Sequence, residues 1–441
     1  MLSRFGFRHG VHPPELKELT AGLAIRRVPY PDELVLPLRQ HTGKPARAIV
    51  KPGDRVERGD TLAEADGWVS TPIHASAAGT VEEIRLWPHA DGSYAPAVRL
   101  RVDRYSPQAP RSRVVPDWEA LTPAELIGAI RAAGLVGLGG AAFPTHVKLS
   151  PPKDVTIDTI LVNGCECEPY LTSDHRTMVE YPERVQRGIR IMMRCLGVRR
   201  ALIGVERNKP DAVEAIRATL PADLNVQVYP LEVKYPQGAE KMLIRALAGR
   251  EVPSGKLPMH VGVVVQNVGS AATIAEVFET GLPLVERIVT VTGRGVRRPA
   301  NLIVPVGMKV RDLLDACGGL TDDARELIFG GPMMGLAQSN LDSPVLKGTT
   351  GVVVLSERET KRERTYPCIR CGHCLDACPV FLNPQHLGQL ALRQRWDDME
   401  AEHLADCMLC GCCGYTCPSN IPLPQLFALA KTALRKRPVP A

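Results

Sequence analysis

Short apolar runs dominate the first part of the chain. They occupy residues 34–36, 47–50, 80–84 and 97–100. Turn sequences rich in Gly and Asp, such as 52–54 and 58–60, separate these runs. Short apolar runs between turn residues are typical of strands, so we expect residues 31–110 to form a small all-β module. Residues 1–30 are rich in Pro and Gly and are expected to form an extended N-terminal arm.

Strand-like and helical patterns alternate over residues 115–283. Apolar runs of strand length occupy 156–162, 201–205, 226–233 and 261–265. Helical spacing of apolar residues is found at 184–195, 212–220 and 240–248. A further helix should begin after Thr122, because Pro123 follows it and Glu125 completes a capping box. Alternating strands and helices predict an α/β domain.

The pattern changes twice more toward the C-terminus. Residues 284–352 return to short strands with one helix, which fits a β-grasp-like module. These elements are expected at 287–292, 302–306 and 310–316. Residues 353–361 are charged and are expected to be a linker. The remainder of 353–441 is expected to be helical around cysteine-rich turns, and it ends in a basic tail from Lys431 to Arg437.

Composition narrows the class of protein. The chain has 441 residues, 44% hydrophobic and 23% charged, which is typical of a soluble protein of several domains. It has no apolar run long enough to span a membrane and no signal peptide at its N-terminus, so we expect it in the cytoplasm. The net charge of +6 leaves room for an anionic lipid surface or an acidic partner. Aromatic residues are only 5%, so nucleic acid is not expected as a partner.

The cysteines carry the clearest chemical signal. Nine of the 13 lie between residues 368 and 417, in two runs of the form C-x2-C-x2-C-x3-C-P. This is the bacterial ferredoxin pattern, in which the fourth cysteine of each run binds the other cluster. It predicts two [4Fe–4S] clusters and makes zinc a poor alternative. The expected ligands are Cys368, Cys371, Cys374 and Cys417 for the first cluster, and Cys407, Cys410, Cys413 and Cys378 for the second. Cys412 is left over.

Two loops in the α/β segment could form a ligand site. Residues 137–142 match the dinucleotide pattern G-x-G-x-x-A, but a helix instead of a strand precedes them, so the Rossmann interpretation fails. Such small residues could let a planar ring approach the backbone, or they could form a simple connection. Residues 163–169 directly follow an apolar strand, where α/β folds place ligands, although a solvated loop is the alternative.

Several segments resemble known families. GLVGLGGAAFPTHVKL and NGCECEP look like the FMN-binding segments of the NADH-oxidising flavoprotein subunit of respiratory complex I, and residues 235–240 and 266–268 resemble its next two elements. VKPGDRVERGDTL resembles the lipoyl/biotinyl-type barrel-sandwich hybrid, without its acceptor lysine. The whole chain is more similar to the C subunit of the Rnf (Rsx) electron-transport complex. It shares that family's VHPPE start, its GGPMMG turn at 330–335 and both cysteine runs.

This resemblance implies a function. The chain would be a peripheral subunit on the cytoplasmic face of the inner membrane, in an ion-translocating NAD:ferredoxin oxidoreductase. It would pass electrons between NADH, non-covalent FMN and two [4Fe–4S] clusters. Its partners would be the other subunits of the complex, with ferredoxin or flavodoxin reached through them. The alternatives are a diaphorase subunit of a soluble hydrogenase or formate dehydrogenase, and a flavin-free scaffold that only relays electrons.

The same resemblance implies the multidomain α/β fold and the site residues. The fold would combine a barrel-sandwich hybrid, an FMN/NADH α/β domain, a β-grasp module of the SLBB type and a helical two-cluster domain. Flavin contacts would come from Gly137, Gly139, Gly140, Lys148, Asn163 and Glu166, with Tyr235, Gly238 and Asn267 completing the cofactor site. The nicotinamide nucleotide would meet Glu168 and Glu240. Cys165 and Ala239 replace acidic residues of the complex I pattern.

Overall fold

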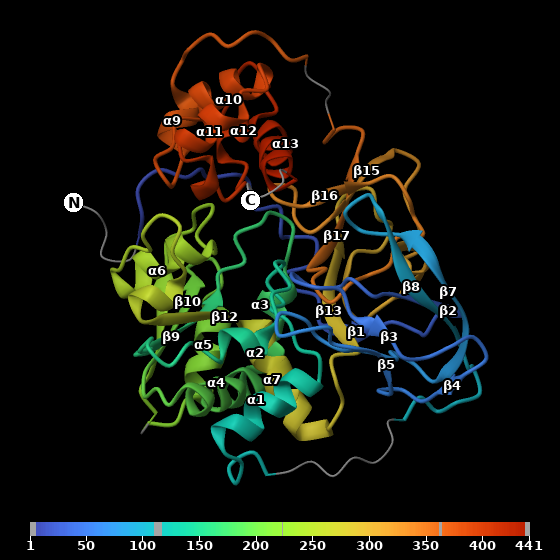
Figure 1. The fold of residues 1–441 in the computed structure, drawn as a ribbon. Coiled ribbons are helices and arrows are strands. Elements are labelled where there is room, and N and C mark those ends of the chain that lie inside the picture. The colour runs from blue at the N-terminus through green and yellow to red at the C-terminus, as the bar shows by residue number, and fades with distance from the viewer. Residues whose placement is uncertain (1–5, 110–116, 223, 361–363, 437–441) are drawn as a thin grey trace, which may run out of the picture.

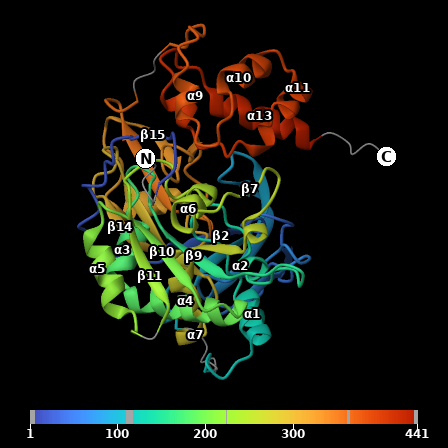
Figure 2. The ribbon, with the colours of Figure 1, turned by 90° about the vertical axis from the view of Figure 1, so that its left-hand side faces the viewer.

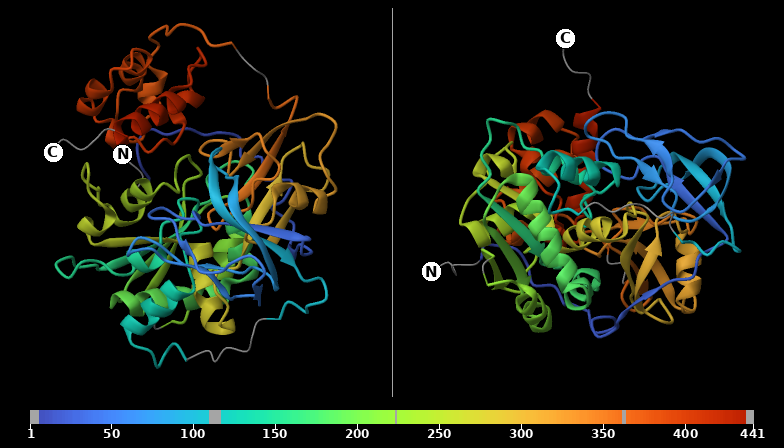
Figure 3. Two further views of the ribbon diagram at one scale, coloured as in Figure 1. Left: turned by 45° about the vertical axis from the view of Figure 1, so that its right-hand side comes forward. Right: turned by 90° about the horizontal axis from the view of Figure 1, so that it is seen from below.

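A computed structural model describes residues 6–109, 117–222, 224–360 and 364–436. The α/β domain and two β modules lie side by side, as the view from below shows (Figure 3, right). The helical C-terminal domain lies above them, against one end of the α/β domain (Figures 1 and 2).

The first β module consists of two antiparallel sheets. Their strand orders are β2-β8-β7-β4 and β3-β5-β6. The strands are β2 (Glu33–Pro37), β3 (Arg47–Ala48), β4 (Arg55–Val56), β5 (Thr61–Glu64), β6 (Ile73–His74), β7 (Gly79–Pro88) and β8 (Tyr94–Val102). The predicted small all-β module is confirmed, with its longest strands in the β7–β8 hairpin.

The α/β domain is built on a parallel sheet of order β11-β10-β9-β12. Its strands are β9 (Thr159–Gly164), β10 (Ala201–Glu206), β11 (Val226–Leu231) and β12 (Val263–Asn267). Its helices are α1 (Pro123–Ala132), α2 (Thr145–Lys148), α3 (Ser173–Glu180), α4 (Pro182–Leu196), α5 (Pro210–Thr219), α6 (Glu240–Ala248) and α7 (Val268–Thr280). Side chains alternate along β9, because Ile160 and Val162 pack in the core with α4 and α7, whereas Leu161 packs with α6.

The second β module contains a mixed sheet of order β1-β14-β13-β17-β15-β16. Its elements are β1 (Ile25–Arg27), β13 (Glu286–Thr292), β14 (Ala300–Pro305), α8 (Val310–Ala316), β15 (Ala324–Phe329), β16 (Leu336–Gln338) and β17 (Gly351–Ser356). Two expectations are corrected here. The arm contributes β1, and the predicted linker at 353–361 begins inside β17, whose apolar residues are buried between β13 and β15.

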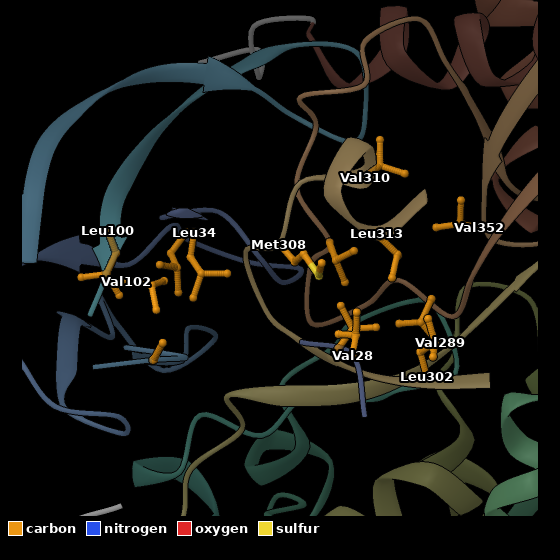
Figure 4. Close-up of a cluster of buried hydrophobic side chains, with 14 of the residues drawn as sticks. Val28, Leu34, Leu100, Val102, Val289, Leu302, Met308, Val310, Leu313 and Val352 are labelled. Atoms are coloured by element: carbon orange, nitrogen blue, oxygen red, sulfur yellow. The ribbon is translucent and has the colours of Figure 1, made fainter. Parts of the chain in front are cut away.

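The two β modules share one hydrophobic core. Leu34, Leu100 and Val102 of the first module belong to the same buried cluster as Val289 and Leu302 of the second (Figure 4). Each Å² of apolar surface that is buried contributes about 25 cal/mol of stability, so this continuous core holds the two modules together. The modules are separated by the α/β domain in sequence but joined in the fold.

The C-terminal domain is helical around its cysteines, as predicted. It contains α9 (His373–Ala377), α10 (Pro384–Leu392), α11 (Trp396–Ala401), η2 (Leu404–Asp406), α12 (Cys412–Tyr415) and α13 (Leu423–Arg435). Leu387, Met399 and Phe427 form the centre of its own small core. No helix within the described part of the chain has the length and apolar character needed to cross a bilayer.

Candidate functional site

Two asparagines lie next to each other at the carboxyl edge of the parallel sheet, where Asn267 of β12 pairs in register with Asn163 of β9. Asn163 donates from Nδ2 to the Gly238 carbonyl at 2.8 Å, and its Oδ1 accepts from the Cys165 amide at 3.0 Å. Asn267 caps α7 by accepting from the Gly269 amide at 2.8 Å. Both asparagines therefore fix the loops that surround this edge of the sheet.

The glycine loop covers the end of β12. Gly137 donates from its amide to the Phe143 carbonyl at 2.8 Å, which closes the loop between α1 and α2. A Cβ added to Gly139 would lie 3.4 Å from the Cβ of Asn267. Gly140 is exposed at a φ of +104°, with no atom within 4 Å of the position of an added Cβ. The loop therefore presents bare backbone beside Asn267, which suits close approach of a planar ligand.

A partly exposed ion pair lies at the same edge. The Nζ of Lys148, at the end of α2, is 2.7 Å from Oε1 of Glu240, the first residue of α6. It also donates to the Val265 carbonyl of β12 at 3.1 Å. The two side chains remain 30% and 39% exposed, so both charged groups can be reached from solvent. The structure thus brings together Gly139, Lys148, Asn163, Glu240 and Asn267.

The Glu166 carboxylate is buried against the start of α3. Its carboxylate accepts hydrogen bonds from the Asp174 amide at 2.9 Å and the His175 amide at 3.2 Å, so it caps the start of α3. Asp174 lies beside it, and its pKa is raised to about 7 by burial and by repulsion from Glu166. The Asp174 carboxylate accepts from Nδ2 of Asn267 at 2.6 Å. Sequence analysis did not single out Asp174, which no recognised motif marks.

Glu168 and Tyr235 point toward other parts of the chain. The Glu168 carboxylate accepts from the amides of Met333 and Met334, at 3.0 and 2.9 Å, in the turn at 330–335. Burial raises the pKa of Glu168 to about 7. Tyr235 is 1% exposed and donates from its hydroxyl to the Cys410 carbonyl at 2.7 Å. Neither side chain lies with the exposed pair Lys148 and Glu240.

Gly238 is required by close packing. A Cβ at this position would lie 2.5 Å from the Cys165 carbonyl oxygen, closer than Cβ atoms come to other atoms. The Gly238 amide also donates to Sγ of Cys167 at 3.4 Å. Residues 235–240 are therefore held against the loop that follows β9.

The cysteine runs surround two cavities. The first is lined by Cys368, Cys371, Cys374 and Cys417. The second is lined by Cys378, Cys407, Cys410, Cys412 and Cys413. Each cavity combines three cysteines at x2 spacing from one run with the last cysteine of the other run. This is the division of ligands that two exchanged [4Fe–4S] clusters require, so the cysteines present fit these groups.

Four family models match successive segments of the chain. The family model described as the RnfC barrel sandwich hybrid domain matches residues 5–105, and that of the Nuo51 FMN-binding domain matches 130–276. An SLBB domain matches 288–337, and a 4Fe-4S dicluster domain matches 364–421. These matches confirm the predicted fold class, including the barrel-sandwich hybrid and the SLBB-type module.

Relatives that are named as subunits of complexes match nearly the full length of the chain. The chain is 44% identical over 400 residues to the C subunit of the proton-translocating ferredoxin:NAD(+) oxidoreductase complex of Clostridium ljungdahlii, covering 90% of this chain and 87% of that one. It is 42% identical to the C subunit of the Na(+)-translocating complex of Acetobacterium woodii, with 91% and 90% coverage. The chain belongs to the family of Rnf complex C subunits. The C subunit of the ion-translocating oxidoreductase complex of Rhodobacter capsulatus is 41% identical, over 99% of this chain and 84% of its own length.

In this member of the Rnf family, the second cavity is the one that lies against the FMN-type domain. Tyr235 of that domain is buried in one apolar cluster with Cys410 and Cys412. Ala377, which precedes Cys378, belongs to the same cluster. The first cavity is more open to solvent, because Cys371 is exposed and the neighbouring Ile369 is 68% exposed. The two cavities of this Rnf protein are therefore not equivalent.

Proposed function

We propose that this chain is the peripheral electron-transfer subunit of an ion-translocating NAD:ferredoxin oxidoreductase, passing electrons between NADH, FMN and two [4Fe–4S] clusters. The observation that carries the proposal is the position of the second cysteine cavity, directly against the domain that matches an FMN-binding family. The relatives named as C subunits of ferredoxin:NAD(+) oxidoreductase complexes support the same function.

The flavin would bind at the carboxyl edge of the parallel sheet. Lys148 would contribute the positive charge for its phosphate, and Gly139 the bare backbone for its ring. Asn163 and Asn267 would hold the loops around it, with Gly137, Gly140 and Gly238 allowing the backbone to come close. FMN supplies the ability to accept two electrons together from a nicotinamide and to release them one at a time.

The carboxylates divide into two kinds. Glu240 is partly exposed beside Lys148, and we propose that it meets the nicotinamide nucleotide. Glu166 and Glu168 would act through the loop that carries them, since their carboxylates hold α3 and the turn at 330–335. Tyr235 would connect this site to the second cluster through its hydrogen bond to Cys410.

The structure also suggests an order for the clusters. Electrons from the flavin would reach the second cavity first, because its cysteines pack against Tyr235. They would leave from the first cavity, where Cys371 is exposed to a partner. Ferredoxin or flavodoxin would exchange electrons with this chain through other subunits of the complex.

Attachment to the membrane would depend on those subunits, on the cytoplasmic face. The basic tail contributes less than its sequence suggests. The Nζ of Lys431 donates to the carbonyls of Ala405 and Cys407, at 3.1 and 2.5 Å, so this amine is used within the domain. Arg437 lies outside the described residues. An anionic surface yields only about 1 kcal/mol for each nearby cation, so protein contacts would dominate.

Two measurements separate the proposal from its alternatives. The full chain is purified anaerobically with FMN and reconstituted clusters, and its flavin, iron and NADH–ferricyanide activity are measured. We expect one FMN, about eight iron atoms and NADH-dependent activity. A chain with clusters but without flavin would be the relay scaffold. A chain that is active but never recovered with membrane subunits from cells would be the soluble diaphorase.

A further inference from the structure

One segment of the N-terminal arm bridges the α/β domain and the cysteine domain. Residues 7–17 run between the α/β domain and the cysteine domain, in the gap visible beneath α9–α13 (Figure 1). We call this segment the strap. Its contacts at one end are with the loop after β9, and at the other with the first cysteine run. No motif of a cofactor site falls within it.

The flavin-side anchor of the strap is Lys17. Its Nζ donates to the carbonyls of Glu166, Glu168 and Leu171, at 2.8, 2.8 and 2.5 Å. The residue is only 8% exposed, and burial lowers the pKa of its amine. All three donors of an ammonium group are therefore used to hold the backbone of a single loop.

A second contact fixes the same loop, because the Tyr170 amide donates to the Glu15 carbonyl at 2.9 Å. The strap therefore sets the shape of the segment that begins at Asn163 and carries the two glutamates.

The cluster-side anchor is formed by His9 and Gly10. The Gly10 amide donates to the Ala377 carbonyl at 3.1 Å, and Nδ1 of His9 lies 2.5 Å from the Asp376 carbonyl. The His9 ring also meets Phe381 edge-to-face, with centroids 4.7 Å apart. Asp376 and Ala377 directly precede Cys378, which lines the second cavity.

The middle of the strap joins the turn that connects the two sites. Val11 and Tyr235 exchange backbone hydrogen bonds of 2.8 and 2.9 Å, and Tyr235 donates to the Cys410 carbonyl. Gly10 must lack a side chain here. Its φ is +82°, and an added Cβ would lie 2.5 Å from the Tyr235 carbonyl oxygen. The absence of a side chain at Gly10 thus lets the backbone of the strap meet the backbones at Tyr235 and Ala377.

We propose that the strap fixes the second cluster at a set separation from the flavin site, so that His9, Gly10 and Lys17 are positioning residues for electron transfer between them. The proposal rests on the proposed function and adds no chemical step to it. It assigns the control of electron transfer between the flavin and the second cluster to the strap. The strap lines neither cysteine cavity, but it holds the backbone of the loop after β9 and of the first cysteine run.

The decisive experiment compares two glycines of the same arm. Gly10→Ala adds a Cβ that must move by about 1 Å to reach an ordinary contact, whereas Gly22→Ala adds one with nothing within 4 Å. The full chain with FMN and clusters is mixed rapidly with NADH, and flavin and cluster absorbance are followed separately. We expect unchanged flavin reduction in both variants. Cluster reduction should slow severalfold and only in Gly10→Ala, because the rate of electron transfer falls steeply as the separation between two cofactors grows.

A second readout does not depend on activity. Hydrogen exchange of peptides covering 7–17 and 373–381 should rise in Gly10→Ala and stay unchanged in Gly22→Ala. If Gly10→Ala fails to fold, His9→Ala removes the Asp376 contact without adding atoms and should also slow cluster reduction.

Cluster reduction in either of these variants at the rate seen with Gly22→Ala would overturn the proposal. A wild-type chain whose flavin is not reduced by NADH would instead refute the proposed function, and the exchange measurement would still decide whether the strap holds the domains.

Discussion

Replacing Lys148 with Met tests whether the exposed ion pair at the sheet edge is a cofactor site. Lys148 and Glu240 are 30% and 39% exposed, and a surface ion pair of this kind stabilises a fold by only about 0–1 kcal/mol. The thermal unfolding temperature should therefore change little. A phosphate held by the same amine is different, because a hydrogen bond to a charged group contributes about 1.5–3 kcal/mol.

That difference converts directly into affinity. Losing about 1.5–3 kcal/mol raises a dissociation constant by about 10- to 150-fold. The assay is a titration of FMN into flavin-free protein, followed by quenching of flavin fluorescence. Freed from Lys148, the Glu240 carboxylate should weaken FMN binding further by repelling the phosphate.

Lys241 provides the matched control. It is the next residue of α6, its side chain is 31% exposed, and its Nζ lies 3.4 Å from Asp406. Lys241→Met removes the same charge from a similar environment and should leave FMN affinity unchanged. Equal FMN affinity in Lys148→Met and in the wild type would show that Lys148 only pairs with Glu240, and would refute our placement of the phosphate.

Other predictions address the clusters, the glycine loop, a buried acid and the membrane. Cys413→Ser should lower iron from about eight atoms per chain toward four or three, while Cys412→Ser should retain all of it; the reverse result would exchange their roles. Gly139→Val should abolish FMN binding and keep both clusters, because its added methyl groups would press on Asn267; retained flavin would make the loop a mere connection. The raised pKa of Glu168, about 7 against a usual 4.5, means that the folded state holds a proton that the unfolded state releases, so stability should fall as pH rises through 7. The Glu168→Gln side chain cannot ionise, so the unfolding temperature of this variant should fall less than that of the wild type between about pH 5 and 8. An equal fall in both proteins would show that Glu168 does not cause the pH dependence. High salt should release little of the protein from membranes, because screening weakens lipid attraction but not apolar protein contacts; complete release would favour the basic tail.

Local sequence patterns predicted the elements whose apolar residues follow a regular spacing. The helices α6 and α8 have the predicted bounds, because their apolar residues follow helical spacing between clear boundaries. The helix α7 is not predicted, since Val268–Thr280 is rich in small residues and is buried on most sides between α4 and the sheet. The strand β17 was assigned in part to a linker, because the charged residues after Ser356 conceal a short apolar run.

The candidate site, too, was predicted only in part from the sequence. The resemblance implied that Asn163 and Asn267 belong to one cofactor site. The structure brings them together because the carboxyl ends of neighbouring parallel strands meet at one edge. The sequence motifs could not predict where Glu166 and Glu168 point. The partners of Glu168 lie about 165 residues away, in a turn of another module. Contacts of this kind depend on how domains dock, which no local pattern encodes.

The composition of the two cysteine cavities has a consequence for biosynthesis. Cys417 completes the lining of the first cavity, and Cys378 completes that of the second. A nascent chain that has emerged only as far as the first run therefore lacks Cys417, the fourth cysteine of the first cavity. With ligands divided in this way, both clusters would be completed only after synthesis has passed the second run, and a product truncated between the runs would lack ligands for both. Loading of both clusters would thus report that synthesis has passed Cys417.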